Sequence, residues 1–138
     1  MIEIKALTVQ PGDKPAHMAT PPVLDILVYA VILSGTPAPL SCEAKSEQAV
    51  SCSNGATATW DPRTNAVSVN GTPVYIQDGR YKFGNGLSGG RNSFGWTAFS
   101  NGVMIRRDYL GGHPDAYFIN PDLLCETVGE GKAACRKR

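Results

Sequence analysis

The sequence predicts an all-β protein, an antiparallel meander of short hairpins that closes into a small barrel of about eight strands or folds into a two-sheet sandwich. Asn-Gly pairs, the strongest short-range hairpin signal, occur at residues 54–55, 70–71, 85–86 and 101–102. Asn-Gly favours a type I′ turn, because both central residues of that turn need positive φ. The chain also has 15 Gly, 10 Pro and only 18% charged residues, which is typical of tight turns and short strands rather than long surface helices.

A length of 138 residues suffices for one domain with a single hydrophobic core. Within it we distinguish an irregular N-terminal arm, residues 1–40, from a β domain, residues 41–138, that carries the four cysteines. The formal net charge of +1 argues against a nucleic-acid binder, which usually has a strong basic excess.

The N-terminal arm does not share the hairpin pattern. Residues 2–9 alternate apolar and polar side chains, as a half-buried strand does. Residues 23–33 form an apolar run that contains Asp25 and is too short to span a membrane. Two interpretations of this run stay open: the apolar region of a leader peptide, or a buried strand or short helix of the mature fold. For the mature fold, its Ile, Val and Tyr residues favour a strand.

The strand candidates of the β domain are short apolar or alternating runs between turn signals. They are residues 42–45, 49–53, 56–60, 66–69, 73–77, 80–83, 94–100, 103–107, 116–119, 123–127 and 132–136.

The same spacing separates Cys42 from Cys52 and Cys125 from Cys135, and each pair flanks a polar turn. Paired strands bring such positions close enough for a disulfide, whereas structural zinc sites favour closer cysteines and often histidine. We therefore expect disulfides, preferably within each hairpin. The alternative pairing joins the first hairpin to the last and closes the barrel. Either pairing implies an oxidising compartment, periplasmic or extracellular.

Two catalytic motifs occur without the structure that their chemistry needs. Residues 86–90 read Gly-x-Ser-x-Gly and residues 84–89 read Gly-x-Gly-x-x-Gly, but neither run is followed by a helical pattern. His17 and His113, the two histidines, are far apart and lack an acidic cluster for a metal. The sequence therefore predicts a non-catalytic protein with no metal and no cofactor.

A Gly/Ser-rich loop, residues 84–95, interrupts the rhythm of two-residue turns. A long loop on a rigid β scaffold is a common site of recognition. We therefore expect an exported binding module whose partner is a protein or another cell-envelope macromolecule, with no nucleic acid and no transmembrane span. The candidate partner-binding residues are Ser88, Gly89, Gly90, Arg91, Asn92, Phe94 and Trp96.

Several of these features resemble the membrane-bound and periplasmic inhibitors of c-type lysozyme: Cys52, the run 67–71, the run 88–91, Trp96 and Cys125. The resemblance implies a small antiparallel barrel that inserts a Ser-Gly-rich loop into the lysozyme cleft, with Ser88 and Arg91 facing the catalytic carboxylates. The loop is shorter here, and its aromatic residue is displaced to Phe94. A third possibility is a structural component of an envelope or virion assembly, with residues 1–40 as a docking arm.

Overall fold

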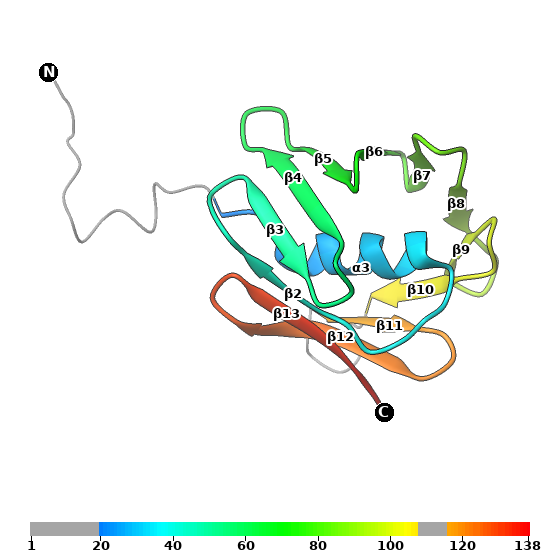
Figure 1. The fold of residues 1–138 in the computed structure, drawn as a ribbon. Helices are drawn as coiled ribbons and strands as arrows, with labels where there is room; N and C mark the ends of the chain where they lie inside the picture. Colours follow the sequence, from blue (N-terminus) through cyan, green and yellow to red (C-terminus); the bar gives the residue numbers. More distant parts are fainter. Residues whose placement is uncertain (1–19, 108–115) are drawn as a thin grey trace, which may run out of the picture.

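The computed structural model describes residues 20–107 and 116–138. In this part of the chain, antiparallel strands form a closed barrel around one helix, α3 (Val23–Ser34) (Figure 1). The strands are β2 (Ser41–Ala44), β3 (Ala49–Cys52), β4 (Thr57–Asp61), β5 (Ala66–Val69), β6 (Thr72–Gln77), β7 (Arg80–Phe83), β8 (Ser88–Arg91), β9 (Thr97–Phe99), β10 (Met104–Arg107), β11 (Ala116–Ile119), β12 (Leu123–Gly129) and β13 (Lys132–Lys137).

The barrel confirms the predicted all-β class and antiparallel meander, but the expected number of about eight strands is wrong. Twelve described strands follow one another around the wall in sequence order, and β13 closes the barrel by pairing with β2. Barrel diameter grows with strand number, and about eight strands leave an interior that side chains alone can fill. The wider barrel has room for a helix along its interior.

Residues 23–33 lie in helix α3, so the short helix that the sequence allowed is right and the strand that its residue types favoured is wrong. A closed barrel offers no free strand edge in its interior, so a segment there must satisfy its own backbone hydrogen bonds, as a helix does. A helix that is apolar on all sides is stable only when buried. Its buried residues are Val23, Ile26, Leu27, Val28, Tyr29, Ala30, Val31 and Ile32.

The helix ends at Ser34 and is capped by Gly35, whose φ of 74° lies in the left-handed region that glycine tolerates best. The carbonyl of Ile32 accepts a hydrogen bond from the Gly35 N–H at 3.1 Å. It also accepts one at 2.8 Å from the Asn101 side chain, which comes from the turn between β9 and β10. A hairpin turn of the wall thereby holds the end of the central helix.

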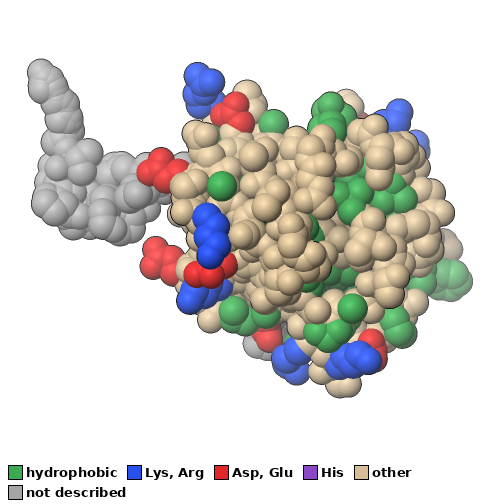
Figure 2. All heavy atoms as spheres, viewed as in Figure 1, with side chains coloured by type: hydrophobic (Ala, Val, Ile, Leu, Met, Phe, Trp, Pro, Cys, Tyr) green, Lys and Arg blue, Asp and Glu red, His purple; other side chains and the backbone are tan. Residues whose placement is uncertain are grey.

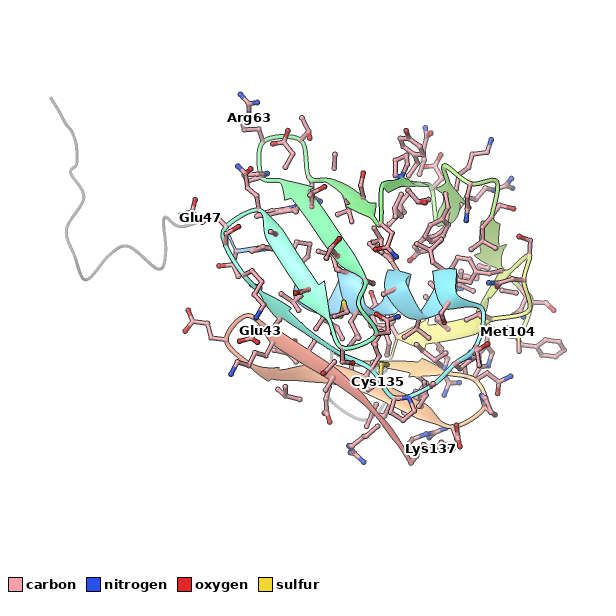
Figure 3. The ribbon with its side chains drawn as sticks, in the orientation of Figure 1. Glu43, Glu47, Arg63, Met104, Cys135 and Lys137 are labelled. Atoms are coloured by element: carbon pink, nitrogen blue, oxygen red, sulfur yellow. A yellow bond between two sulfur atoms is a disulfide. The ribbon has the colours of Figure 1, made fainter. Side chains whose placement is uncertain are left out.

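Both disulfides form within hairpins, as preferred from the spacing. Cys42 is bonded to Cys52 and Cys125 to Cys135, with Cα–Cα distances of 4.0 and 3.9 Å. All four cysteines are buried on the inner face of the wall; Figure 3 labels Cys135. The two stapled hairpins are neighbours, because β13 pairs with β2. The alternative expectation, that the first hairpin is joined to the last, is therefore right in placing the two hairpins side by side and wrong in placing a disulfide between them.

The Asn-Gly pairs adopt two kinds of turn rather than the single type I′ form that was expected. Asn70 and Gly71 have φ of 51° and 80°, as a type I′ turn requires. At the other three pairs only the glycine has positive φ. There the Asn side-chain oxygen accepts the backbone N–H two residues later, at 3.0–3.2 Å. This hydrogen bond stabilises a three-residue turn that ends in a left-handed glycine.

The predicted strands of the β domain agree with the structure except at residues 84–100, where the expected loop contains β8 and the expected strand shortens to β9. The strand predicted at residues 2–9, and both histidines, lie outside the described residues.

Candidate functional site

The prediction of a binding loop at residues 84–95 is wrong in its centre, which forms strand β8. Gly89 pairs with Tyr81 of β7 on one side and with Phe99 of β9 on the other. Turns at residues 84–86 and 93–95 reverse the chain before and after β8. The glycine run hid this strand because glycine is disfavoured in strand interiors. The predicted residues therefore lie in the wall and in one hairpin turn rather than in a projecting loop.

Two adjacent glycines of β8 have different reasons to be glycine. A Cβ at Gly89 would lie 2.4 Å from a ring carbon of Phe99, so no other residue fits beneath that ring. A Cβ at Gly90 would have nothing within 4 Å, and Gly90 does not have positive φ. Packing therefore explains Gly89 and leaves Gly90 unexplained.

Gly90 lines a shallow hollow of about 1180 Å³ on the barrel wall over β6 to β9. Hollows of about 310 to 430 Å³ occur elsewhere on the described surface. The floor of the hollow consists of small residues: Ser88 and Gly90 of β8, Ala98 of β9, and Ser100, which follows β9. In register, Gly90 lies opposite Ala98, and Ser100 donates its backbone N–H to the Ser88 carbonyl at 2.8 Å. We call this surface the β6–β9 hollow.

The rim of the β6–β9 hollow is basic. Arg80, Lys82 and Arg91 line it, and Asp78 is the acidic side chain among its described lining residues. None of these four groups belongs to an ion pair within residues 20–107 and 116–138. Tyr75, which is 59% exposed, lies opposite Lys82 on the neighbouring strand.

This basic rim contrasts with another part of the surface. Figure 2 shows basic and acidic side chains intermixed on the left of the face in view. The charge of the hollow is therefore a local feature, which a net charge of +1 for the whole chain conceals.

The turn from β8 to β9 carries an exposed aromatic residue. Asn92 holds this turn, since its side-chain oxygen accepts the N–H groups of Phe94 and Trp96 at 2.9 and 3.1 Å. Phe94 occupies the position that Asn54, Asn85 and Asn101 take in the similar turns, and it is 84% exposed. The turn gains nothing from a phenyl ring at its tip, so Phe94 stays a candidate for contact with a partner.

The structure thus divides the predicted residues by role. Four of them line the β6–β9 hollow: Ser88, Gly89, Gly90 and Arg91. Asn92 and Phe94 form the adjoining turn, and Trp96 packs under the guanidinium of Arg106 at 4.8 Å. Among the four lining residues, Gly89 must be glycine because of the packing of Phe99.

The residues that β6 and β7 contribute to the hollow were not predicted from the sequence. Tyr75, Arg80 and Lys82 were assigned to strands but not to a site. Their outward alternation in the hairpin around Asp78 was visible, but only strand order shows that this hairpin lies beside β8.

A second polar cluster joins the helix to the wall. The Tyr117 hydroxyl donates to Asp25 Oδ1 at 3.0 Å and accepts a hydrogen bond from Arg107. Burial raises the pKa of the Tyr117 hydroxyl, and the nearby Asp25 carboxylate raises it further. Burial likewise raises the pKa of Tyr29 on α3. Both tyrosines are therefore neutral in the folded protein, and the cluster fixes the first turn of α3 against β10 and β11.

No set of three or more potential metal ligands gathers within the described residues. Among those same residues, α3 is too short to cross a lipid bilayer, and no other helix is present to do so. Comparison of the chain with protein-family models, curated proteins and solved structures finds no match.

Proposed function

We propose that this protein is a non-catalytic, exported binding module that recognises a macromolecular partner through the β6–β9 hollow and the adjoining turn at Phe94. The observation that carries the proposal is Gly90. This residue has neither a conformational nor a packing need for glycine, yet it lies in the floor of the hollow.

Glycine in a strand interior is destabilising by about 0.5–1 kcal/mol relative to alanine. A glycine with no structural reason is typical of a site where another molecule approaches the backbone closely. Ser88, Ala98 and Ser100, which also line the hollow, have small side chains that project little above the backbone around Gly90. A partner can therefore reach the backbone of β8 without displacing protein atoms.

Export is part of the proposal because of the two disulfides. Disulfides persist in the periplasm and outside the cell and are rare in the cytosol. We expect the protein isolated from the cells that produce it to show both bridges by intact mass before and after reduction and alkylation. Four free thiols in that protein would contradict export.

The binding surface is tested by comparing two leucine variants of equal size. Gly90→Leu places a side chain in the hollow, whereas Thr59→Leu places one on an exposed part of β4. Each variant and the wild type are immobilised and exposed to the secreted and envelope fractions of the producing cells. We expect a partner that the wild type and Thr59→Leu retain and that Gly90→Leu loses by at least tenfold.

Equal retention of every bound species by all three proteins would overturn the proposed surface. Circular dichroism and urea unfolding of Gly90→Leu check that any loss of binding does not come from loss of fold.

Inhibition of a c-type lysozyme remains a second candidate, because Ser88 and Arg91 are both exposed and both line the hollow. A guanidinium and a hydroxyl are suitable donors to the carboxylates of a lysozyme cleft. A lysis assay with micromolar protein tests this candidate, with Arg91→Gln as the matched variant. Inhibition that Arg91→Gln abolishes would support it, and undiminished lysis would exclude it.

A further inference from the structure

Arginine and aromatic side chains alternate on the outer wall beside the β6–β9 hollow. The guanidinium of Arg106 lies 4.8 Å from the ring centre of Trp96 and 5.6 Å from that of Phe118. The guanidinium of Arg138 lies 4.2 Å from the ring centre of Phe118. We call these four residues the arginine–aromatic ladder.

Stacking on a ring fixes the plane of a guanidinium but leaves its N–H groups at the edge. Arg106 is exposed, so its N–H groups are accessible to another molecule. A guanidinium binds a carboxylate through two parallel hydrogen bonds, and less entropy is lost when its plane is already fixed. The ladder therefore presents cations that are ordered before any anion arrives.

These arginines have no acidic partner in the described part of the chain. Neither Arg106 nor Arg138 forms an ion pair there, whereas Arg136 is paired with Glu126 at 3.4 Å. Ordered arginines without carboxylates are expected where the carboxylate comes from another molecule.

The ladder is continuous with the β6–β9 hollow. Ala98 in the floor of the hollow lies opposite Met104 of β10, which Figure 3 labels. Trp96 lies on the same outward side of the chain as Ala98, and Arg106 on the same side as Met104, because side chains two residues apart share a face. Together with the rim of Arg80, Lys82 and Arg91, the ladder forms one basic surface with apolar residues between its charges.

We infer that the partner docks an acidic protein segment, rich in Glu or Asp, across the arginine–aromatic ladder and the β6–β9 hollow. This inference rests on the proposed function and names the chemistry of its partner. Arginine, aromatic residues and Met, which make up this surface, are the residues enriched in protein–protein interfaces.

A protein fits this surface better than an anionic glycan does. The guanidiniums of Arg106 and Arg138 both lie over the Phe118 ring, so this ring already has stacking partners and is less open to a sugar. An acidic peptide instead supplies carboxylates to the arginines and apolar side chains to Met104 and Tyr75.

The probe is a fluorescein-labelled deca-glutamate peptide, and its binding is measured by fluorescence anisotropy at low and physiological salt. Arg106→Gln removes the central cation of the ladder and should weaken peptide binding by about fivefold or more. Arg63→Gln is the matched control, because Arg63 is exposed on the turn between β4 and β5 and carries the same charge. The control should change affinity by less than about twofold.

The variant Arg106→Lys distinguishes the effect of an ordered guanidinium on binding from the effect of its positive charge alone. It keeps the cation but loses the planar edge, and should bind the peptide more weakly than the wild type. Equal losses in Arg106→Gln and Arg63→Gln would overturn the inference, because binding would then follow net charge alone.

Heparin and a single-stranded dT10 oligonucleotide are competitors in the same assay. Displacement of the peptide by either at lower charge concentration than free deca-glutamate would assign the surface to a glycan or a nucleic acid. If Gly90→Leu abolishes capture of the natural partner while Arg106→Gln does not, the proposed function stands and the acidic partner is excluded. If Arg106→Gln weakens peptide binding and Gly90→Leu retains every partner, the proposed hollow fails instead.

Discussion

The barrel has two unlike sides. On one side β12 and β13 pair over the whole range from Leu123 with Lys137 to Gly129 with Lys132, and both disulfides bond residues directly opposite one another. On the other side β7 and β8 pair only at Tyr81 with Gly89 and at Lys82 with Ser88.

The two sides therefore differ in role: one stabilises the barrel, and the other carries the surface proposed for recognition. Both disulfides hold the side where the chain closes on itself, and the long β12–β13 pairing lies there too. The side that contains no disulfide carries the hollow, the small floor residues and most of the exposed apolar side chains, including Phe94 and Tyr75. Function is commonly found where fewer interactions hold the backbone.

The largest expected effect comes from removing the covalent bonds of the stapled side. Replacing all four cysteines by alanine should lower the free energy of unfolding by about 5 kcal/mol, because a short disulfide loop contributes about 2–3 kcal/mol. Urea unfolding of the wild type, the two single-bridge variants and the bridge-free variant measures this. A bridge-free protein as stable as the wild type would show that pairing alone closes the barrel.

Next in size is the contrast between the two glycines of the hollow side. Gly89→Ala forces a methyl group into the Phe99 ring and should cost about 1–3 kcal/mol of stability. Gly90→Ala meets open space and should leave stability unchanged or raise it by about 0.5 kcal/mol. Thermal and urea unfolding of both variants tests whether the fold needs glycine at residue 89 but not at residue 90. Equal destabilisation of the two variants would show that the fold needs glycine at both.

Two buried tyrosines, Tyr29 on α3 and Tyr117 on β11, should make the free energy of unfolding depend on pH in the alkaline range. Burial raises the pKa values of Tyr29 and Tyr117, so above about pH 10 the folded protein binds more protons than the unfolded chain. The free energy of unfolding should therefore fall as pH rises, by up to about 1.4 kcal/mol per pH unit for each tyrosine.

Urea unfolding from pH 9 to 11 measures this slope, with Tyr29→Phe as the comparison. The variant should show a shallower fall than the wild type. Identical slopes would mean that Tyr29 does not stay protonated in the fold.

The smallest effect is expected at the ion pair across the closure. Glu43 and Lys132 approach to 3.9 Å between β2 and β13, and both side chains are about half exposed; Figure 3 labels Glu43. Exposed ion pairs contribute little, so Lys132→Gln, which removes this pair and leaves the Glu43–Lys45 pair at 3.5 Å in place, should change stability by less than about 0.5 kcal/mol. A loss above about 1 kcal/mol would show that charge, and not only the disulfides and backbone pairing, closes the barrel.

Local signals in the sequence predicted most of the wall. Left-handed glycines such as Gly55 and Gly71 fix the hairpins, and the equal cysteine spacing fixes the two stapled pairs, because each depends only on nearby residues. Local signals did not predict helix α3, because its conformation follows from its enclosure by the barrel. The local propensity of Val28, Val31 and Ile32 favours a strand instead.

The candidate site was predicted in part for the same reason. Ser88, Gly90 and Arg91 are close in sequence and were found together, although as a loop rather than a strand. Arg106 and Phe118 reach the same surface from other strands, and only the register of β10 with β11 places them opposite each other. No pattern within a single segment of the chain contains that information.

The central helix also constrains how the chain reaches its folded state. Helix α3 packs against β12 and β13, which the ribosome adds roughly a hundred residues later, about 5–20 s at ordinary rates of synthesis. Throughout that interval an apolar segment has no finished barrel to enclose it. Residues 23–34 therefore gain their full enclosure only after the last two strands have been made.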